Sequence, residues 1–303
     1  LTQSGNIEIH VAEDKTLSYS GAAVNLGART LTMSGKGTFN NTNALVLNNA
    51  SSKLLLSNTG TVSSVSTSLA STGIDVDQSS TITSLTVGHT TPVSIAAGKT
   101  LSGGVTVTAG SIKLGETGTV ASTISMSGGI LDADATLTIS GALTQLGNIA
   151  IDVAEDKTLS YSGATIEIGA SELTLLGGGT FSNTNPLELD QGQSQLNLLG
   201  ITANYIRTKS NSLGITVENT STVNELTVGH VTPVSIYPNQ SLNGSFKIYQ
   251  NSNLQLNNTG TLAANVAISG NGGKVEAQNS MTFSGSLQQV DQHNGFELKI
   301  ASG

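Results

Sequence analysis

The stretch GNIEIHVAEDKTLSYSG, residues Gly5–Gly21, returns as GNIAIDVAEDKTLSYSG at Gly147–Gly163, with fifteen of seventeen positions identical at an offset of 142 residues. Farther along, LTVGHTTPVSI (85–95) returns as LTVGHVTPVSI (226–236). Self-similarity over a whole chain is typical of repeat proteins. The tandem units are 1–142 and 143–286, and residues 287–303 are the start of a third unit or a cap.

A shorter repeat lies inside each unit. The phrase TLSYSG (16–21) is varied as TLTMSG (30–35) and TLTISG (136–141). Similarly, KLLLSNTGTV (53–62) returns as LQLNNTGTL (254–262). Coils of about 20 residues would place such phrases on successive turns of a solenoid.

The local pattern indicates strands. Apolar residues alternate with polar ones, as in Ile7-Glu8-Ile9-His10-Val11, and β-branched residues are frequent. Gly, Asn and Ser-Gly between these runs favour tight turns. A sandwich closes after about 100 residues, whereas this pattern continues through all 303. The sequence therefore predicts an all-β fold, a single elongated parallel β-solenoid over residues 1–303, and the usual hand of parallel connections favours a right-handed β-helix.

Composition agrees with this fold and excludes several classes. The chain has no Cys, 11% charged residues, 3% aromatic residues and a net charge of −8. The lack of cysteine excludes a disulfide scaffold, and the acidic balance argues against nucleic-acid binding by phosphate neutralisation. No apolar run is long enough to predict membrane insertion as a helix.

The first residues also belong to the repeating register, because LTQSGNI at 1–7 matches LTQLGNI at 143–149. We therefore expect the chain to be an excerpt of a longer repetitive protein. A complete two-copy protein that lost its leader is the alternative.

The phrases TLTISG and LTMSGKGTF (31–39), the abundance of Ser, Thr, Gly and Asn, and the missing cysteines resemble the β-helical passengers of bacterial autotransporters and filamentous haemagglutinins. This resemblance implies an exported protein at the bacterial surface or outside the cell, often an adhesin, and it carries no catalytic signature. We therefore expect a non-catalytic stalk or fibre without a cofactor. Its expected partners are a host or matrix glycan or protein and, through open strand edges, further copies of the chain.

Metal ligands are sparse in the sequence. Asp75 and Asp77 lie two residues apart, as do Asp132 and Asp134, so each pair shares one strand face and is a candidate for Ca²⁺. Solvated surface carboxylates are the other interpretation of these pairs.

The histidines fit turns better than metal sites. His89 and His230 occupy equivalent places in V-G-H, next to a proline, and no carboxylate lies near them in sequence. His10 aligns with Asp152.

Three alternative functions stay open. A carbohydrate-active β-helix needs clustered carboxylates with Arg or Lys, yet Arg29 and Arg207 are the only arginines in the sequence. A glycan-binding module is expected to expose aromatic residues. An ice-binding solenoid needs outward threonines on successive coils. Its candidate T-x-T pairs are irregularly spaced, at 30/32, 81/83, 106/108 and 136/138.

Overall fold

The computed structural model describes residues 3–57, 60–269, 271–290 and 297–300. The chain divides into two compact units: unit 1 holds residues 1–149 and 162–164, and unit 2 holds 150–161 and 165–303. Every regular element among the described residues is a β-strand. The predicted parallel β-solenoid is confirmed, with about 14 turns in all and coils of roughly 20 residues.

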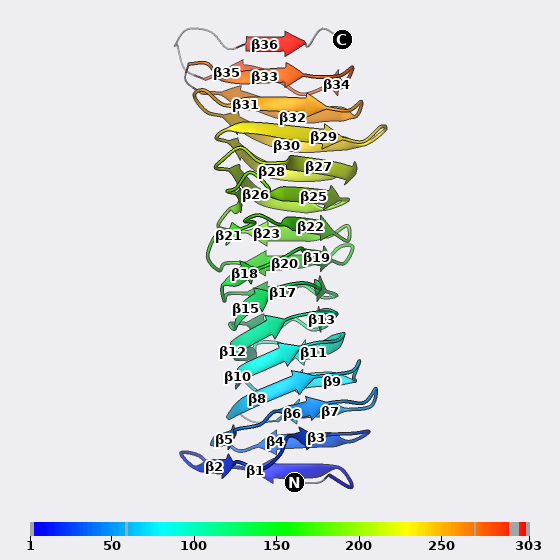
Figure 1. Ribbon diagram of the computed structural model, residues 1–303, viewed down its shortest axis with the longest axis vertical. Helices are drawn as coiled ribbons and strands as arrows, with labels where there is room; N and C mark the ends of the chain where they lie inside the picture. The colour runs from blue at the N-terminus through cyan, green and yellow to red at the C-terminus, as the bar shows by residue number, and fades with distance from the viewer. Residues whose placement is uncertain (1–2, 58–59, 270, 291–296, 301–303) are drawn as a thin grey trace. The chain divides into compact units, whose positions relative to one another are not determined.

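Unit 1 is built from two parallel sheets, which we name sheet A and sheet B (Figure 1). The sheet A strands of unit 1 are β1 (Ile7–His10), β4 (Thr30–Ser34), β7 (Lys53–Leu56), β9 (Gly73–Val76), β11 (Thr91–Ile95), β13 (Ser111–Leu114) and β16 (Ile130–Ala133). Its sheet B strands are β2 (Thr16–Tyr19), β3 (Val24–Asn25), β5 (Thr38–Asn41), β6 (Leu45–Leu47), β8 (Thr61–Thr67), β10 (Ser80–Val87), β12 (Thr100–Val107), β14 (Thr119–Val120), β15 (Thr123–Met126), β17 (Leu137–Ile139) and β18 (Leu143–Gln145).

Unit 2 repeats this arrangement. Its sheet A strands are β19 (Ile149–Val153, whose first residue belongs to unit 1), β22 (Glu172–Leu176), β25 (Gln195–Leu199), β27 (Gly214–Asn219), β29 (Val231–Ile236), β31 (Asn253–Asn257), β33 (Lys274–Ala277) and β36 (Glu297–Ile300). Its sheet B strands are β20 (Thr158–Tyr161), β21 (Ile166–Glu167), β23 (Thr180–Asn183), β24 (Leu187–Leu189), β26 (Thr202–Thr208), β28 (Ser221–Val228), β30 (Ser241–Ile248), β32 (Thr261–Ile268), β34 (Thr282–Phe283) and β35 (Leu287–Gln289).

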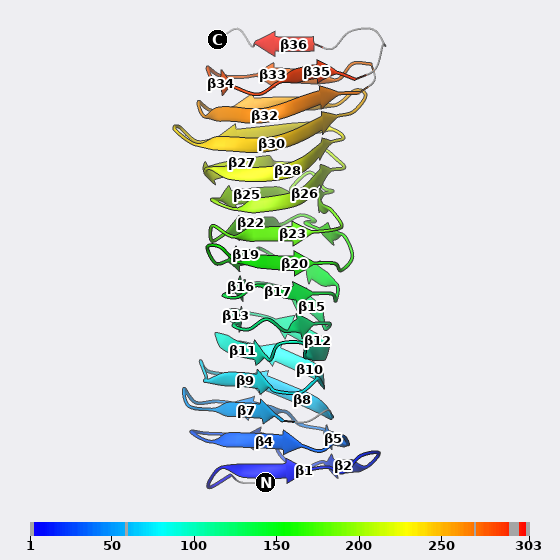
Figure 2. The same ribbon diagram turned by 180° about the vertical axis from the view of Figure 1, so that it is seen from behind.

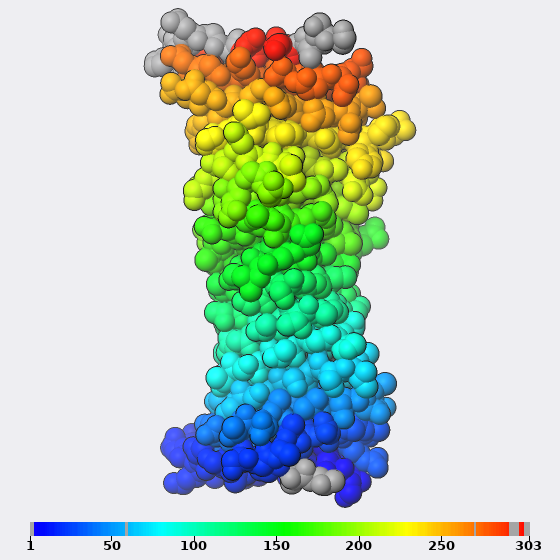
Figure 3. Space-filling view, in the orientation of Figure 1, coloured from blue at the N-terminus to red at the C-terminus, as the bar shows by residue number. Residues whose placement is uncertain are grey.

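The core of each unit consists of apolar side chains stacked in register. In unit 1, Val65 pairs with Leu85, Leu85 with Val105, and Val105 with Ile124, and all four are at most 3% exposed. The strands that carry them, β8, β10, β12 and β15, follow one another in Figure 2. Each coil thus shields the apolar inner face of its neighbour, at about 25 cal/mol per Å² of buried surface. On the side drawn in Figure 3, side chains of successive coils close over this interior within each unit.

A buried asparagine holds the same corner in both units. Asn183 Nδ2 donates hydrogen bonds to the carbonyl oxygens of Asn185 (2.9 Å) and Tyr205 (2.6 Å), and its Oδ1 accepts from the backbone amide of Tyr205 at 3.2 Å. Asn41 makes the equivalent contacts with Asn43 and Ser64 in unit 1. The asparagine side chain therefore supplies hydrogen-bond partners to backbone groups between neighbouring sheet B strands. Buried polar groups in proteins generally need such partners.

The charged phrase A-E-D-K forms the same turn in both units. Asp14 and Asp156 adopt a left-handed φ of 59°. The amide of Lys15 donates to the Ala12 carbonyl oxygen at 3.1 Å, and Lys157 makes the equivalent bond at 3.0 Å. The near-identical sequences thus produce the same local structure.

Candidate functional site on the outer face of sheet B

The outer face of sheet B carries two columns of small, uncharged polar residues in each unit. The threonine column contains Thr16, Thr38, Thr61 and Thr81 in unit 1, and Thr158, Thr180, Thr202 and Thr222 in unit 2. The mixed column, two residues farther along each strand, contains Ser18, Asn40, Ser63 and Thr83 in unit 1, and Ser160, Ser182, Asn204 and Asn224 in unit 2. These columns cross successive coils at the strand spacing of about 4.8 Å.

Hydrogen bonds run along the mixed column. In unit 2, Asn224 Nδ2 donates to Asn204 Oδ1 at 2.8 Å, and Asn204 Nδ2 donates to Ser182 Oγ at 2.9 Å. In unit 1, Ser63 Oγ donates to Asn40 Oδ1 at 3.2 Å. Such ladders stabilise neighbouring coils without the repulsion that stacked like charges would cause.

The T-x-T pairs identified in the sequence do not lie together on a single face of the solenoid. Thr30 and Thr32 lie on β4 of sheet A, whereas Thr81 lies on β10 of sheet B. The regular columns escaped sequence reasoning because their second member varies among Ser, Asn and Thr. The signal that could have found them is a phrase T-x-S, T-x-N or T-x-T near the start of the sheet B strands that carry the columns.

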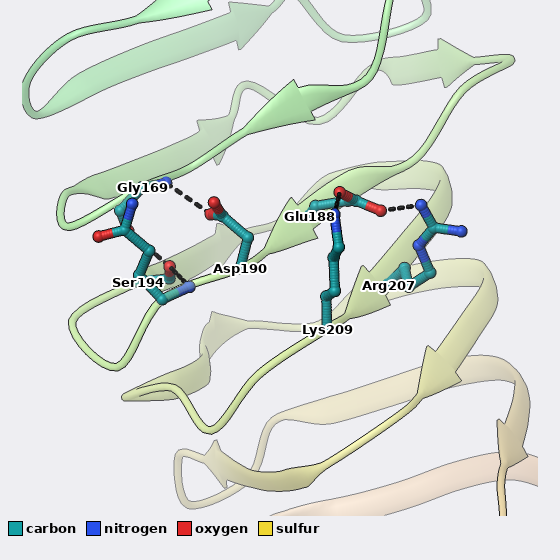
Figure 4. Close-up of polar contacts among 7 residues, drawn as sticks. Gly169, Glu188, Asp190, Ser194, Arg207 and Lys209 are labelled. Atoms are coloured by element: carbon teal, nitrogen blue, oxygen red, sulfur yellow. Dashed lines mark hydrogen bonds and ion pairs between the residues drawn. The ribbon is translucent and has the colours of Figure 1, made fainter.

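A charged cluster in unit 2 interrupts the uncharged face (Figure 4). Glu188 on β24 is 2% exposed and pairs in register with Arg207 on β26. Arg207 binds one oxygen of the Glu188 carboxylate, and Lys209 Nζ lies 3.5 Å from the other. Glu167, opposite Glu188 on β21, is the preceding residue of the same column.

In this cluster the Glu188 carboxylate is engaged in ion pairs. Both oxygens of Glu188 are engaged by cations, and a glycosidase requires two carboxylates facing a substrate. The equivalent residues of the first repeat are Val46, Ser66 and Ser68, so the cluster belongs to one copy only. The joint replacement of Val46 and Ser66 by an oppositely charged pair is the sequence signal that could have revealed it.

The candidate calcium ligands are spread over separate strands. Asp75 on β9 forms an ion pair with Lys53, and Asp132 on β16 lies 2.8 Å from Lys113 Nζ. Asp77 and Asp134 follow these strands and are exposed. Within the described ranges no group of three or more His, Cys, Asp or Glu side chains converges on a possible metal position.

The two equivalent histidines lie in exposed turns. His89 precedes β11, and its carbonyl oxygen accepts a hydrogen bond from Thr91 Oγ1 at 2.8 Å. His230 precedes β29 and makes the equivalent contact with Thr232 at 3.3 Å. His293 lies outside the described residues.

A shallow hollow on unit 2 is lined by Tyr237, Pro238, Asn258, Thr259 and Asn279, with a volume of about 510 Å³. Tyr237 is 43% exposed. In the first repeat its place is taken by Ala96, so this aromatic surface is also confined to one copy.

These features define a repetitive parallel β-solenoid with a largely uncharged polar outer face. No family model, curated protein or solved structure matches the chain. Among the described residues, none belongs to a helix that could cross a membrane.

Proposed function

We propose that the chain is the non-catalytic structural and adhesive repeat region of an exported bacterial surface protein, in which it forms a rigid stalk or fibre. The observation that carries this proposal is the in-register stacking within each unit of both the apolar core and the outer polar columns. Each coil repeats the same backbone pairing, so rigidity comes from the repeat itself.

Adhesion by such a surface is multivalent. A repeated outer face offers many equivalent weak contacts, and their combined avidity exceeds that of any single contact. The small uncharged side chains of the polar columns suit hydrogen bonding to hydroxyl-rich glycans or to protein backbones.

The test compares binding at different densities. Beads coated with the chain at increasing density are applied to matrix proteins and to a glycan array, and retention is measured under flow. We expect retention to rise more steeply than in proportion to density, while the free chain binds weakly. Retention equal to that of albumin-coated beads at every density would refute adhesion. Release of soluble sugars from polysaccharides would refute the non-catalytic role.

The hollow at Tyr237 favours glycan binding as a second candidate function. An exposed aromatic ring beside amide side chains, here Asn258 and Asn279, is a suitable surface for a sugar ring. If the hollow carries this activity, Tyr237→Ala abolishes glycan-array signals, whereas Tyr249→Ala, at an exposed tyrosine outside the hollow, preserves them.

A further inference from the structure

Three tyrosines distinguish the outer surface of unit 2 from that of unit 1. Each replaces a small residue of the first repeat, namely Ser64 by Tyr205, Ala96 by Tyr237 and Thr108 by Tyr249. Tyr205 lies on β26, and Tyr249 directly follows β30. Both side chains point outward from sheet B, because the residues beside them in sequence, Ile206 and Ile248, are fully buried. Unit 2 therefore carries aromatic surface where the first repeat has none.

An ion pair lies between Tyr205 and Tyr249. Glu225 on β28 is the register partner of Tyr205, and its carboxylate accepts a hydrogen bond from Lys247 Nζ on β30 at 2.9 Å. Lys247 is two residues before Tyr249, so the two side chains share one face of the strand. The Glu225 carboxylate raises the pKa of Lys247, and Tyr249 and Tyr205 lie close enough to add to this rise. These four side chains thus form one surface across three neighbouring strands.

The long side chains of this surface lie over the sheet. Thr227 on β28 pairs in register with Arg207 on one side and with Lys247 on the other. It is 4% exposed, whereas its equivalent Thr86, which has a serine and a threonine as neighbours in unit 1, is exposed. The neighbours account for the difference, so the stems of Arg207 and Lys247 cover Thr227. Their side chains remain 40% and 46% exposed, which keeps the charged ends accessible.

More positive than negative charge is exposed on this surface. Glu188 is 2% exposed, and Asp190 Oδ1 accepts a hydrogen bond from the Gly169 amide at 2.9 Å within its own corner (Figure 4). Glu225 is more accessible, but Lys247 offsets its charge. The Lys209 side chain is 59% exposed and adds a third cation to Arg207 and Lys247. Charge complementarity therefore favours an acidic partner, although the whole chain has a net charge of −8.

Arg207 and Lys247 are placed to bind two separate carboxylates. They lie two coils apart, at a distance of about 10 Å along the solenoid. One terminal nitrogen of Arg207 binds Glu188, and the other points away from that carboxylate in Figure 4. Guanidinium and ammonium groups both form charge-assisted hydrogen bonds with carboxylates. A densely charged polymer fits less well, because Glu225 lies on the strand between the two cations and repels it.

We propose that the outer face of sheet B in unit 2, from Tyr205 to Tyr249, is a binding site for an acidic polysaccharide with widely spaced carboxylates. Tyr205 and Tyr249 stack on sugar rings, and Arg207 and Lys247 bind the carboxylates. The site rests on the proposed adhesive function, for which it supplies a ligand class. It differs from the hollow at Tyr237, which directly follows β29 of sheet A.

The test uses hyaluronate oligosaccharides, in which every second sugar carries a carboxylate, and measures their affinity for the full chain by isothermal titration calorimetry. The first variant combines Tyr205→Ser with Tyr249→Thr, which restores the residues of the first repeat and so suits the fold. We expect affinity to fall about tenfold or more, because two aromatic contacts are lost. Glu225→Gln should raise affinity, because it removes the exposed carboxylate beside Lys247.

Tyr237→Ala is the matched control, since it also restores a first-repeat residue but lies outside this face. It should leave the affinity for hyaluronate unchanged. Glycan binding at the hollow predicts the opposite order for Tyr237 and Tyr249, so the two variants separate the sites.

Equal affinity for hyaluronate and for uncharged dextran would overturn the proposal, as would no binding by the folded chain. Tighter binding of dextran sulfate or polyglutamate that the tyrosine variant does not weaken would show attraction by charge alone and also overturn it. The affinity is measured in solution, so it is independent of retention on surfaces. Hyaluronate binding without retention of coated beads would refute adhesion and leave this site standing, whereas retention without hyaluronate binding would overturn the site alone.

Discussion

Single asparagines and glycines fix the local backbone shape of particular coils. Asn41 and Asn183 are 2% and 3% exposed. Each side chain forms hydrogen bonds with backbone groups of sheet B that would otherwise need water. A buried backbone group without a hydrogen-bond partner costs about 1–3 kcal/mol. We therefore expect these two side chains to contribute substantially to the free energy of unfolding.

Asn183→Ala is expected to lower the free energy of unfolding of unit 2 by about 3 kcal/mol, because it leaves the Tyr205 carbonyl and amide without their partner. Urea unfolding followed by circular dichroism measures the change. The control is Asn224→Ala, an exposed member of the mixed column, which should stay within about 0.5 kcal/mol. Equal effects of the two substitutions would contradict the bridging role of Asn183.

Gly244 is required by its backbone conformation and its surroundings. Its φ is 137°, and a Cβ at this position would overlap the carbonyl oxygen of Val223 on the neighbouring strand β28. We expect Gly244→Ala to cost about 3 kcal/mol. Gly98→Ala is the control: φ is +70° there and nothing lies within 4 Å, so only the left-handed strain of about 1–2 kcal/mol applies. Thermal unfolding of the two variants should rank them in this order.

Neighbouring strands of unit 2 carry oppositely charged residues at positions where the first repeat has uncharged ones. Glu188, Arg207 and Lys209 stand where the first repeat has Val46, Ser66 and Ser68. Glu188 is 2% exposed, and its buried carboxylate is offset by the two cations Arg207 and Lys209.

Glu188→Val alone is expected to cost about 2 kcal/mol, since Arg207 loses a charge-assisted partner and Arg207 Nε already lacks one. Converting all three positions to the first-repeat set, with Arg207→Ser and Lys209→Ser added, should recover most of that loss. Urea titration of the single and triple variants measures both values. A triple variant no more stable than the single one would contradict this account of the cluster.

The β33–β36 pairing is expected to depend on pH. Hydrogen bonds from Asn253 and Lys299 lower the pKa of the Glu276 carboxyl, so this contribution is present above the usual carboxyl range and is lost as pH falls through the lowered value. The Glu297 carboxylate raises the pKa of Lys274, so that contribution is present below the usual lysine range and is lost as pH rises through the raised value.

The nuclear Overhauser contact between Val275 and Leu298, which are register partners, reports this pairing. It should be strongest at neutral pH and weaken at both extremes. Lys299→Met should remove the part of the acid dependence that Lys299 causes. A contact of constant intensity from pH 3 to pH 7 would contradict the role of Glu276.

For the molecule as a whole, the sequence was sufficient for the fold class because period two, the 142-residue repeat and the turn residues all agree. It was not sufficient for the outer face. Whether Thr61 stacks on Thr38 depends on coil lengths that vary by a few residues, and no local pattern fixes them. Likewise, Glu188 and Arg207 are 19 residues apart in sequence and meet only once the register of β24 and β26 is known.

A repeat protein whose coils contact mainly their neighbours should lose structure locally. In this chain Gly244→Ala, on β30, is expected to raise amide hydrogen exchange by at least tenfold in β30 and in the two strands that pair with it, β28 and β32. Exchange in β4, β7 and β9 of unit 1 should stay within twofold of the unsubstituted chain. Mass spectrometry of peptides from both regions measures the difference. Equal acceleration in the two regions would mean that the chain unfolds as one cooperative block, and the local account of its stability would then be wrong.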